Sequence, residues 1–449
     1  MKDNRDAIDF AKDPVRKIFA RMFLPTLIGM VSMVVLNITD GAFVGHGVSS
    51  DALAAVNIVA PLFMIAGAVG LMFGIGSSVV ASIHLSKNNE HAANLNITQG
   101  ILASFVTGTV LAIVILSFQK ETCRIFGCSD ALIPLACSYL RWVAAVTPFN
   151  MVGCTGMFAV RLDGHPKFAM LLNCSMALTN IVLDWLLIFP LGMGLEGAAI
   201  ATCTAFGLGN VPLLWFLFTR TKKVHLCSIK MTKTSLQLTA RNLTYQAKIG
   251  LSAFIGEMAI ASIMIIGNYV FIHYLGEDGV AAFSVGCYCL PIVFMMGNSI
   301  VQSIQPVISF AYGQNNAVRM HEALKVAITT AAVSGLGGML LMWFGTGLIT
   351  SVFLPSDCNA YTICLEGLPI YSCAFLFIAV NIVIVGYLQS IEAAVKATLF
   401  TLLRGFIFAI PAFIILPKVV GDTGLWIALP LAEALTLGVF ILTELIRKT

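Results

Sequence analysis

Asp51-Ala-Leu-Ala-Ala55 recurs as Asp278-Gly-Val-Ala-Ala282, at a sequence offset of 227 that keeps the aspartate and the alanine pair in register. Further matches keep this offset without a gap: Asn88-Asn89 with Asn315-Asn316, Ser129-Asp130 with Ser356-Asp357, and Gly197 with Gly424. Chance similarity between apolar helices produces Ala and Ile matches, but polar and glycine positions at one fixed spacing are hard to obtain that way. The spacing therefore indicates an internal duplication of the chain.

The composition indicates what kind of unit is duplicated. Of the 449 residues, 58% are hydrophobic and only 11% are charged, whereas soluble proteins carry roughly 25% Asp, Glu, Lys and Arg. The mean hydropathy is +0.92, and a soluble globule of this length would need more solvating groups on its surface. Long apolar runs such as 28–36 and 336–344 differ from the short alternating segments of a transmembrane β-barrel. The sequence predicts an all-α integral membrane protein.

Breaks in the apolar runs predict twelve transmembrane helices, since each needs about 20 mostly apolar residues. Their expected bounds are 24–46, 53–83, 97–119, 132–158, 168–189, 197–218, 249–275, 280–311, 323–350, 361–386, 398–416 and 424–444, numbered here as spans 1 to 12. The duplication places six spans in each half, and an even number gives both halves the same orientation. We expect parallel repeats that form two pseudo-symmetric six-helix bundles.

This pattern divides the chain into five parts. They are a cytoplasmic amino-terminal segment at 1–23, an N-lobe at 24–218, a cytoplasmic connector at 219–248, a C-lobe at 249–444 and a cytoplasmic tail at 445–449. Counted on this topology, all of the 26 Lys and Arg residues fall on the cytoplasmic side except Lys120, Arg124, Arg141 and Lys418. This asymmetry follows the positive-inside rule for a protein with both termini in the cytoplasm.

Several classes of protein do not fit the sequence. The basic residues form no nucleic-acid-like patch, and the twelve cysteines lack zinc or redox spacing. The first residues carry charges throughout and no small-residue cleavage site, so we expect no removable signal peptide. We expect a monomer in a bacterial cytoplasmic (inner) membrane, with the lipid bilayer as its surroundings, no nucleic-acid partner and no cofactor.

Ionisable side chains within the predicted spans are few, and each is a functional candidate because a charge in hydrocarbon is costly. The acids away from predicted loops are Asp40 in span 1, Asp184 in span 5, Glu257 in span 7 and Glu433 in span 12, with Glu366 near the outer edge of span 10. The helical rise places Asp40 and Asp184 each about 24 Å from the cytoplasmic start of its span. The two aspartates are therefore expected at one level.

Three neutral polar residues are expected near that level. Asn180 precedes Asp184 by about one turn on the same helix face, and Tyr139 and Thr202 lie about 8 to 10 Å below the outer edge. Two carboxylates in a low dielectric cannot both be charged cheaply, so we expect this layer to bind a proton or to share a cation. Na⁺ prefers oxygen ligands of this kind, and its ligands would be Asp40, Asn180, Asp184 and Thr202.

Each of these residues also has a structural interpretation. Asp40 and Asp184 would then be a buried polar pair, which is a costly way to hold helices together, and Tyr139, Asn180 and Thr202 would form hydrogen bonds between helices. Glu257 has Met30 as its partner at the repeat offset, and this asymmetry makes it a second ion or substrate candidate. Its alternative is snorkelling at a helix edge. Glu433 is a further secondary candidate.

Several motifs, together with the gapless repeat, resemble those of the multidrug and toxic compound extrusion (MATE) transporters, most closely the DinF-like bacterial branch. They are Arg161-x2-Gly164-x-Pro166, Asn180-Ile-Val-Leu-Asp184, Leu191-Gly-Met-Gly194-x2-Gly197-Ala-Ala-Ile-Ala-Thr202 and Asp40-Gly-Ala-Phe-Val-Gly45. The resemblance implies two six-helix lobes that alternate between outward and inward opening, and exchange of incoming H⁺ or Na⁺ for outgoing organic, often cationic, drugs.

The resemblance also implies roles for particular residues. Asp40, Asn180, Asp184 and Thr202 match the N-lobe ion site of DinF-like members, with Tyr139 in the network. Members of another branch use a C-lobe site with a glutamate in span 7, the region of Glu257, but the companion acid of span 10 is not found because Glu366 lies too near the start of that span.

The leading hypothesis is that the protein is a secondary antiporter that exports drug-like compounds. We expect that it is not an enzyme. One alternative is a lipid-linked-precursor flippase of the same superfamily, which would need basic residues facing a cavity. Another is a membrane enzyme or scaffold. The enzyme is disfavoured because no clustered His, paired-acid loop motif or phosphate-cradling Gly loop is found in the sequence, and a scaffold does not explain why carboxylates of separate spans share one depth.

Overall fold

The computed structural model describes residues 8–229 and 232–446, and all regular elements in these residues are helices. Contacts divide the chain into two compact units. Unit 1 is Met1–Phe254 with Ser309–Asn316, and unit 2 is Ile255–Ile308 with Ala317–Thr449. Residues 309–313 are the end of the helix Lys233–Gly313, so the division runs through that helix.

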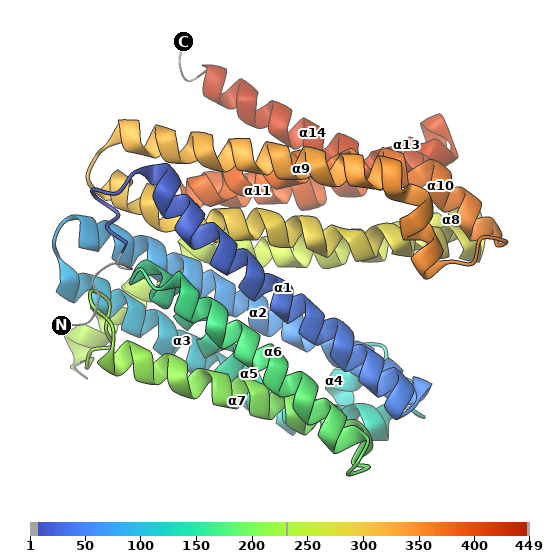
Figure 1. The fold of residues 1–449 in the computed structure, drawn as a ribbon, viewed down its shortest axis with the longest axis horizontal. Coiled ribbons are helices and arrows are strands. Elements are labelled where there is room, and N and C mark those ends of the chain that lie inside the picture. Colours follow the sequence, from blue (N-terminus) through green and yellow to red (C-terminus); the bar gives the residue numbers. More distant parts are fainter. Residues whose placement is uncertain (1–7, 230–231, 447–449) are drawn as a thin grey trace. The chain divides into compact units, whose positions relative to one another are not determined.

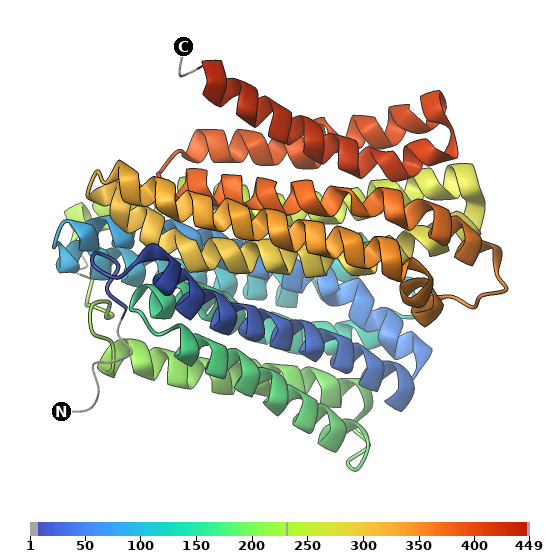
Figure 2. The same ribbon diagram turned by 45° about the horizontal axis from the view of Figure 1, so that its top comes forward.

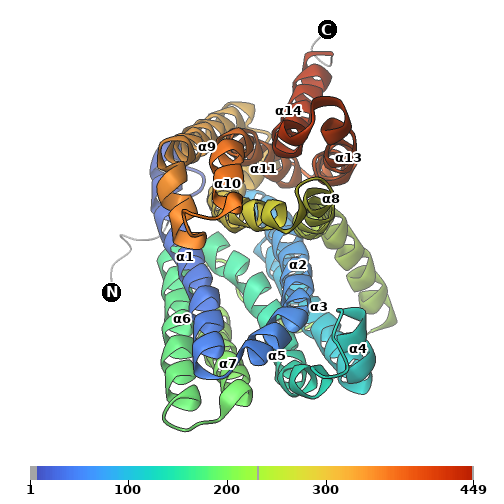
Figure 3. The same ribbon diagram turned by 90° about the vertical axis from the view of Figure 1, so that its right-hand side faces the viewer.

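Unit 1 is built around one central helix. Its helices are α1 (Val15–Gly47), α2 (Ser50–Ser86), α3 (Glu90–Ser117), the short α4 (Gln119–Ile125), α5 (Ile133–Leu162), α6 (Pro166–Ile188), α7 (Gly194–Thr219) and the first part of α8 (Lys233–Gly313). Helix α5 packs against α2, α3 and α7, while α1 lies along α6 and α6 along α7 (Figures 1 and 3). Because α5 is covered by three neighbours, most of its side chains are buried.

Small residues allow the close approach to α5. A Cβ added at Gly70 of α2 would lie 2.7 Å from the Cβ of Cys154, and one at Gly108 of α3 would lie 2.6 Å from the Cα of Pro148. Ser104 and Thr155 add a hydrogen bond of 2.6 Å between α3 and α5. Membrane helices associate through such small-residue contacts and interhelical hydrogen bonds, because lipid is as apolar as their side chains.

Unit 2 contains residues Ile255–Ile308 of α8 and the later helices. These are α9 (Ala317–Phe353), α10 (Asn359–Ser372), α11 (Ala374–Ser390), α12 (Ala394–Leu402), a π-helical turn η2 (Leu403–Ile407), α13 (Ala409–Val420) and α14 (Asp422–Ile446). Helix α9 packs along α10 and α11, and α14 packs against α10, α11 and α13. The α13–α14 pair is the red hairpin of Figure 2.

The helices account for the twelve predicted spans. Eleven helices of the described chain are long and apolar enough to cross a membrane, when α10 with α11 and α12 to α13 are each counted as one. The helix α8 has 81 residues and contains a break at Gly276, where φ is 64° and ψ is −156°. Spans 7 and 8 were expected to meet at residues 276–279, so the two predicted spans account for this one long element.

The duplication is visible in the turns as well as in the sequence. Asn88 and Asn315, which the repeat offset pairs, both have positive φ, at 57° and 54°. The following amides donate to equivalent carbonyls, Asn89 N to His84 O at 3.0 Å and Asn316 N to Ala311 O at 2.9 Å. Asparagine tolerates this left-handed conformation better than most residues do. The matched asparagines therefore end two equivalent helices in the same way.

The helix bounds differ from the predicted spans in several places. Helix α1 begins at Val15 rather than at residue 24, α8 begins at Lys233 inside the predicted connector, and α4 occupies part of a predicted loop. The predicted span 11 contains the π-helical turn η2. Residues 1–7, which open the predicted amino-terminal segment, residues 230–231 of the connector and residues 447–449 of the predicted tail lie outside the described residues.

Candidate functional site

Asp40 and Asp184 face each other across the contact between α1 and α6. Asp40 lies on a buried stripe of α1 with Leu36 and Val44, and Asp184 lies on a buried stripe of α6 with Asn180 and Ile188. Spacings of four residues repeat about every turn, so each acid points to the same side as the apolar residues that pack the two helices together. The exposed fractions are 9% for Asp40 and 0% for Asp184.

The two carboxyl groups are close enough to interact electrostatically. Two ionised carboxylates cannot form a hydrogen bond with each other, because each has only acceptor oxygens. A proton on one of them supplies the donor, and a cation between them removes their repulsion. The geometry therefore suits a single positive charge shared by the pair.

The polar side chains of Asn180, Thr202 and Tyr139 lie near the Asp40–Asp184 pair. Asn180 Nδ2 donates to Thr202 Oγ1 at 3.2 Å, which joins α6 to α7. Tyr139 of α5 is within electrostatic range of both aspartates, and all three polar side chains are buried. The structure thus brings the five N-lobe candidates together from four helices of unit 1.

The site has more acceptors than donors. Within residues 8–229 and 232–446, no hydrogen-bond donor reaches Asp40 Oδ1, either carboxylate oxygen of Asp184, or Asn180 Oδ1. Buried polar atoms are nearly always paired, and an orphaned acceptor in a low dielectric is costly. No group of three or more His, Cys, Asp and Glu side chains suited to a metal ion occurs in that part of the chain. Four free oxygens with two carboxylates fit a proton or a hard monovalent cation instead.

Glu433 of unit 2 differs from these aspartates. Its Oε1 accepts from Arg404 Nε at 3.0 Å and from Arg404 Nη2 at 2.8 Å, and its Oε2 accepts from Asn381 Nδ2 at 2.7 Å. The whole cluster is buried, with Glu433 1% exposed. Glu433 therefore already has a cation and a hydrogen-bond donor, whereas Asp184 has a second acid beside it.

Glu257 lies on α8, half-buried in unit 2. No hydrogen bond or ion pair of the described chain involves its carboxylate, and the structure does not add it to the unit 1 site. Arg404 and Asn381 were missed by the sequence analysis, which counted Arg404 with the cytoplasmic basic residues. The available signal was an arginine inside the apolar run of span 11, at an offset position where the first half has Ala177.

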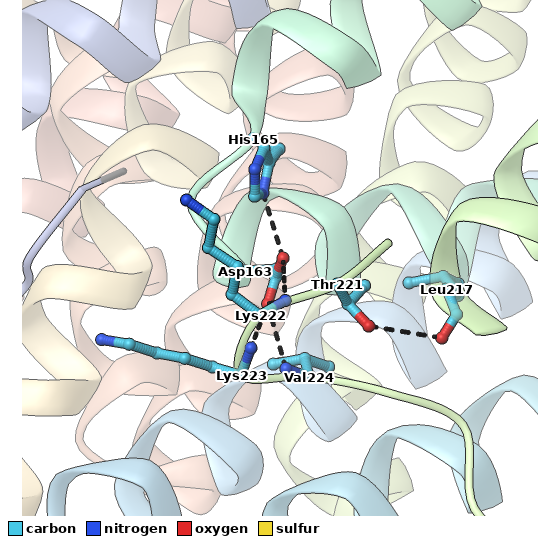
Figure 4. Close-up of polar contacts among 7 residues, drawn as sticks. All are labelled: Asp163, His165, Leu217, Thr221, Lys222, Lys223 and Val224. Carbon is cyan, nitrogen blue, oxygen red and sulfur yellow. Dashed lines mark hydrogen bonds and ion pairs between the residues drawn. The ribbon is translucent and has the colours of Figure 1, made fainter. Parts of the chain in front are cut away.

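A second polar cluster lies at the end of α5, outside the spans. The buried carboxylate of Asp163 accepts three consecutive backbone N–H groups of the connector, from Lys222 at 3.1 Å, Lys223 at 2.7 Å and Val224 at 3.0 Å (Figure 4). His165 Nδ1 lies 3.0 Å from Asp163 Oδ2. A carboxylate facing a run of backbone amides forms strong charge-assisted hydrogen bonds. Asp163 therefore fastens the start of the connector to unit 1.

Asp163→Asn is expected to destabilise the protein by about 1.5–3 kcal/mol, the range for hydrogen bonds to a charged group. The amide keeps one acceptor oxygen but loses the charge and turns an NH₂ group toward backbone donors. Thermal unfolding of the purified protein in detergent measures the effect. Asp130→Asn is the matched control, since its side chain is 86% exposed and its partner Arg124 is also on the surface. Equal midpoints for the Asp163 variant and the control would contradict this role.

The fold and the site define a class: a multi-pass helical membrane protein of two repeated halves, with an acidic layer buried in the first half. The MatE family model matches residues 25–186 and residues 253–415, one match in each half. The two matches cover more than half of the chain. The protein therefore belongs to the MatE family of transporters.

Individual relatives agree with this assignment. The multidrug export protein MepA of Staphylococcus aureus (strain MSSA476) is 24% identical over 444 residues, covering 98% of this chain and 95% of MepA. MepA of Staphylococcus haemolyticus is 24% identical over 449 residues, covering 99% and 97%. The similarity thus extends over nearly the whole of both chains.

Solved structures share the fold. An outward-facing multidrug resistance MATE family transporter of the MOP superfamily has a TM-score of 0.88 at 21% identity, covering 100% of this chain and 98% of the other. A MOP superfamily transporter from Pyrococcus furiosus, described as having a binding pocket of reversed polarity, also has a TM-score of 0.88 at 21% identity, covering 99% and 98%. At this identity the likeness establishes the architecture alone.

Proposed function

We propose that the protein is a secondary antiporter that exports organic, often cationic, drug-like compounds from the bacterial cytoplasm in exchange for H⁺ or Na⁺. The observation that carries the proposal is the acidic layer of unit 1. There Asp40 and Asp184 are buried together, and Asp40 Oδ1 and both carboxylate oxygens of Asp184 have no hydrogen-bond partner in the described chain. Membership of the MatE family and the similarity to proteins named multidrug exporters support the class of substrate. Both termini are proposed to be cytoplasmic and the protein to act as a monomer.

The coupling follows from the chemistry of the pair. A proton or Na⁺ at Asp40 and Asp184 cancels the repulsion of the two carboxylates and lets α1 and α6 pack closely at this level. Loss of that ion leaves two like charges in a low dielectric, which favours an arrangement that admits water or a cationic substrate. Ion and substrate therefore favour different conformations, and exchange requires that difference in affinity.

Asn180 and Thr202 have a supporting part in this scheme. The bond from Asn180 Nδ2 to Thr202 Oγ1 uses the amide donor and leaves Asn180 Oδ1 free as an acceptor. With Na⁺ as the coupling ion, Asp40, Asn180, Asp184 and Thr202 would supply its oxygen ligands. With H⁺ as the coupling ion, the two carboxylates would suffice and the amide would orient them.

Expression in an efflux-deficient bacterial host tests the proposed function. We expect cells with the protein to tolerate higher concentrations of cationic drugs than cells with an empty vector. Inverted membrane vesicles then identify the ion, since drug uptake should follow either an imposed pH step or an imposed Na⁺ step. If resistance is unchanged while the distribution of a lipid-linked precursor across the membrane changes, the protein is a flippase and the proposal is wrong.

A further inference from the structure

The buried cluster of unit 2 is built from three separate spans. Asn381 comes from α11, Arg404 from the π-helical turn η2 and Glu433 from α14. Asn381 Nδ2 also donates to the backbone carbonyl of Glu433 at 2.9 Å, so the amide is held by two acceptors of one residue. The Glu433 carboxylate has donors at both oxygens, and Arg404 supplies two of the three hydrogen bonds.

The local backbone explains how an arginine reaches this place. Leu403–Ile407 is a π-helical turn, a one-residue widening that rotates the side chains that follow and is frequent at functional sites. Gly405, the next residue, packs so close to α8 that an added Cβ would lie 2.3 Å from Ala259 Cβ. The guanidinium lies over the ring of Phe294, 5.2 Å from its centroid. The turn and the glycine thus hold Arg404 between α8 and α14.

The buried carboxylates of the two repeat halves differ in whether they have hydrogen-bond partners. At the repeat offset, Arg404 corresponds to Ala177 and Glu433 to Phe206, while Asp184 corresponds to Pro411. Ala177 is about one turn from Asn180, and Phe206 is about one turn from Thr202. Arg404 and Glu433 of unit 2 therefore lie on helices equivalent to those of Asn180 and Thr202, shifted along them by about one turn. Unit 1 has acids with free acceptors, and unit 2 has an acid whose acceptors are filled.

A small pocket lies beside the guanidinium. Its walls include Ile260, Ile263, Phe294, Thr401 and Gly405 around Arg404, so Arg404 is the one charged group among its lining residues in the described chain. The pocket is otherwise apolar and borders the guanidinium side of the ion pair. Truncation of the arginine would enlarge this space toward Glu433.

We propose that Glu433, oriented by the amide of Asn381, forms a cation site in unit 2 whose permanent occupant is the guanidinium of Arg404. Arg404 is then a positioning residue that supplies inside the chain the positive charge that unit 1 takes from solution. Resting on the proposed function, this assignment also confines ion coupling to the acidic layer of unit 1. Removal of the arginine side chain should leave an empty site with a preference for a planar cation that carries several N–H donors, because a free guanidinium can present to Glu433 Oε1 the two N–H groups that Arg404 presents there.

Guanidinium rescue of Arg404→Ala tests the proposal. The full-length protein is purified in detergent, and its thermal midpoint is measured with millimolar guanidinium chloride or with sodium chloride at equal ionic strength. We expect guanidinium to raise the midpoint of Arg404→Ala by about 2 °C or more relative to sodium, as a ligand bound only by the folded state does. It should not raise the midpoints of the parent protein, of Arg404→Ala/Glu433→Gln or of Arg124→Ala, which removes an exposed arginine paired with Asp130. An equal shift in the double variant, or no shift in Arg404→Ala, would overturn the proposal.

A second variant, Arg404→Gln, tests the proposal if Arg404→Ala does not fold. Arg404→Gln retains bulk and a donor but no charge, so Glu433 must obtain a proton or another cation from solution. Arg404 is the charged group that the described chain places against Glu433. We expect the thermal midpoint of Arg404→Gln, measured relative to the parent, to be higher at pH 5.5 than at about pH 7.5. This dependence on pH should vanish in Arg404→Gln/Glu433→Gln. No difference between the single and double variants would contradict the assignment. Both assays measure folding alone, so their outcome is independent of transport.

Discussion

Asp184→Asn is expected to lower ion-driven drug uptake into inverted vesicles by about 100-fold, the upper part of the range for coupling free energies of 1–3 kcal/mol. The amide has nearly the same shape as the acid but cannot carry a negative charge. The like-charge repulsion with Asp40 is then lost, so the affinity of the layer for a proton or Na⁺ should differ much less between the two conformations. An ion that binds both conformations equally cannot shift their equilibrium.

The measurement requires that the variant is folded and still binds substrate. Equilibrium drug binding to the purified protein should change much less than the uptake rate, because the amide removes the coupling charge and keeps the shape of the side chain. Asp130→Asn is the control, as its exposed side chain lies in the same unit but outside the layer. Uptake by Asp184→Asn at the parent rate, driven by the same ion gradient, would show that the layer is not the coupling site.

Arg404→Met is expected to cost about 3–5 kcal/mol of folding free energy, since it leaves the buried Glu433 carboxylate without its counter-charge. Glu433→Leu should cost a similar amount because it leaves the guanidinium unpaired. The double variant Arg404→Met/Glu433→Leu should be much closer to the parent, as apolar replacements of a whole buried pair are often neutral. Asn381 keeps one partner in every variant, the backbone carbonyl of residue 433.

A double-mutant cycle on unfolding in mixed detergent micelles measures this interaction. Residues in contact show large interaction terms, whereas distant residues show nearly additive effects. The exposed pair Arg124 and Asp130, 3.1 Å apart, provides the comparison and should give about 0.2–1 kcal/mol. Additive effects at Arg404 and Glu433 would mean that their contact contributes little to folding.

The sequence predicted the architecture well because lipid imposes simple rules on it. Long apolar runs determine spans, and the gapless internal repeat determines how many each half contains. The same rules cannot find a π-helical turn, because hydropathy does not distinguish the five residues of η2 from an α-helical turn. The short helix α4 was missed for a related reason, because it lies in a connection that does not cross the membrane.

The acidic layer was predictable because helical rise converts sequence position into depth, and Asp40 and Asp184 had equal depth. Their partners could not be predicted in this way. The bond from Asn180 to Thr202 depends on the rotation of two helices about their axes. Arg404 escaped notice because a topology count assigns each basic residue to one side of the membrane, and Glu433 was therefore considered as an acid without a counter-charge.

Counter-flux of ions tests the central claim most directly. Proteoliposomes receive a drug gradient with no ion gradient, and the movement of H⁺ and of Na⁺ is recorded together with that of the drug. We predict that the parent protein drives one of the two ions against the drug, and that Asp40→Asn/Asp184→Asn moves neither. Drug movement without ion movement in the parent, or undiminished ion movement in the double variant, would contradict the account.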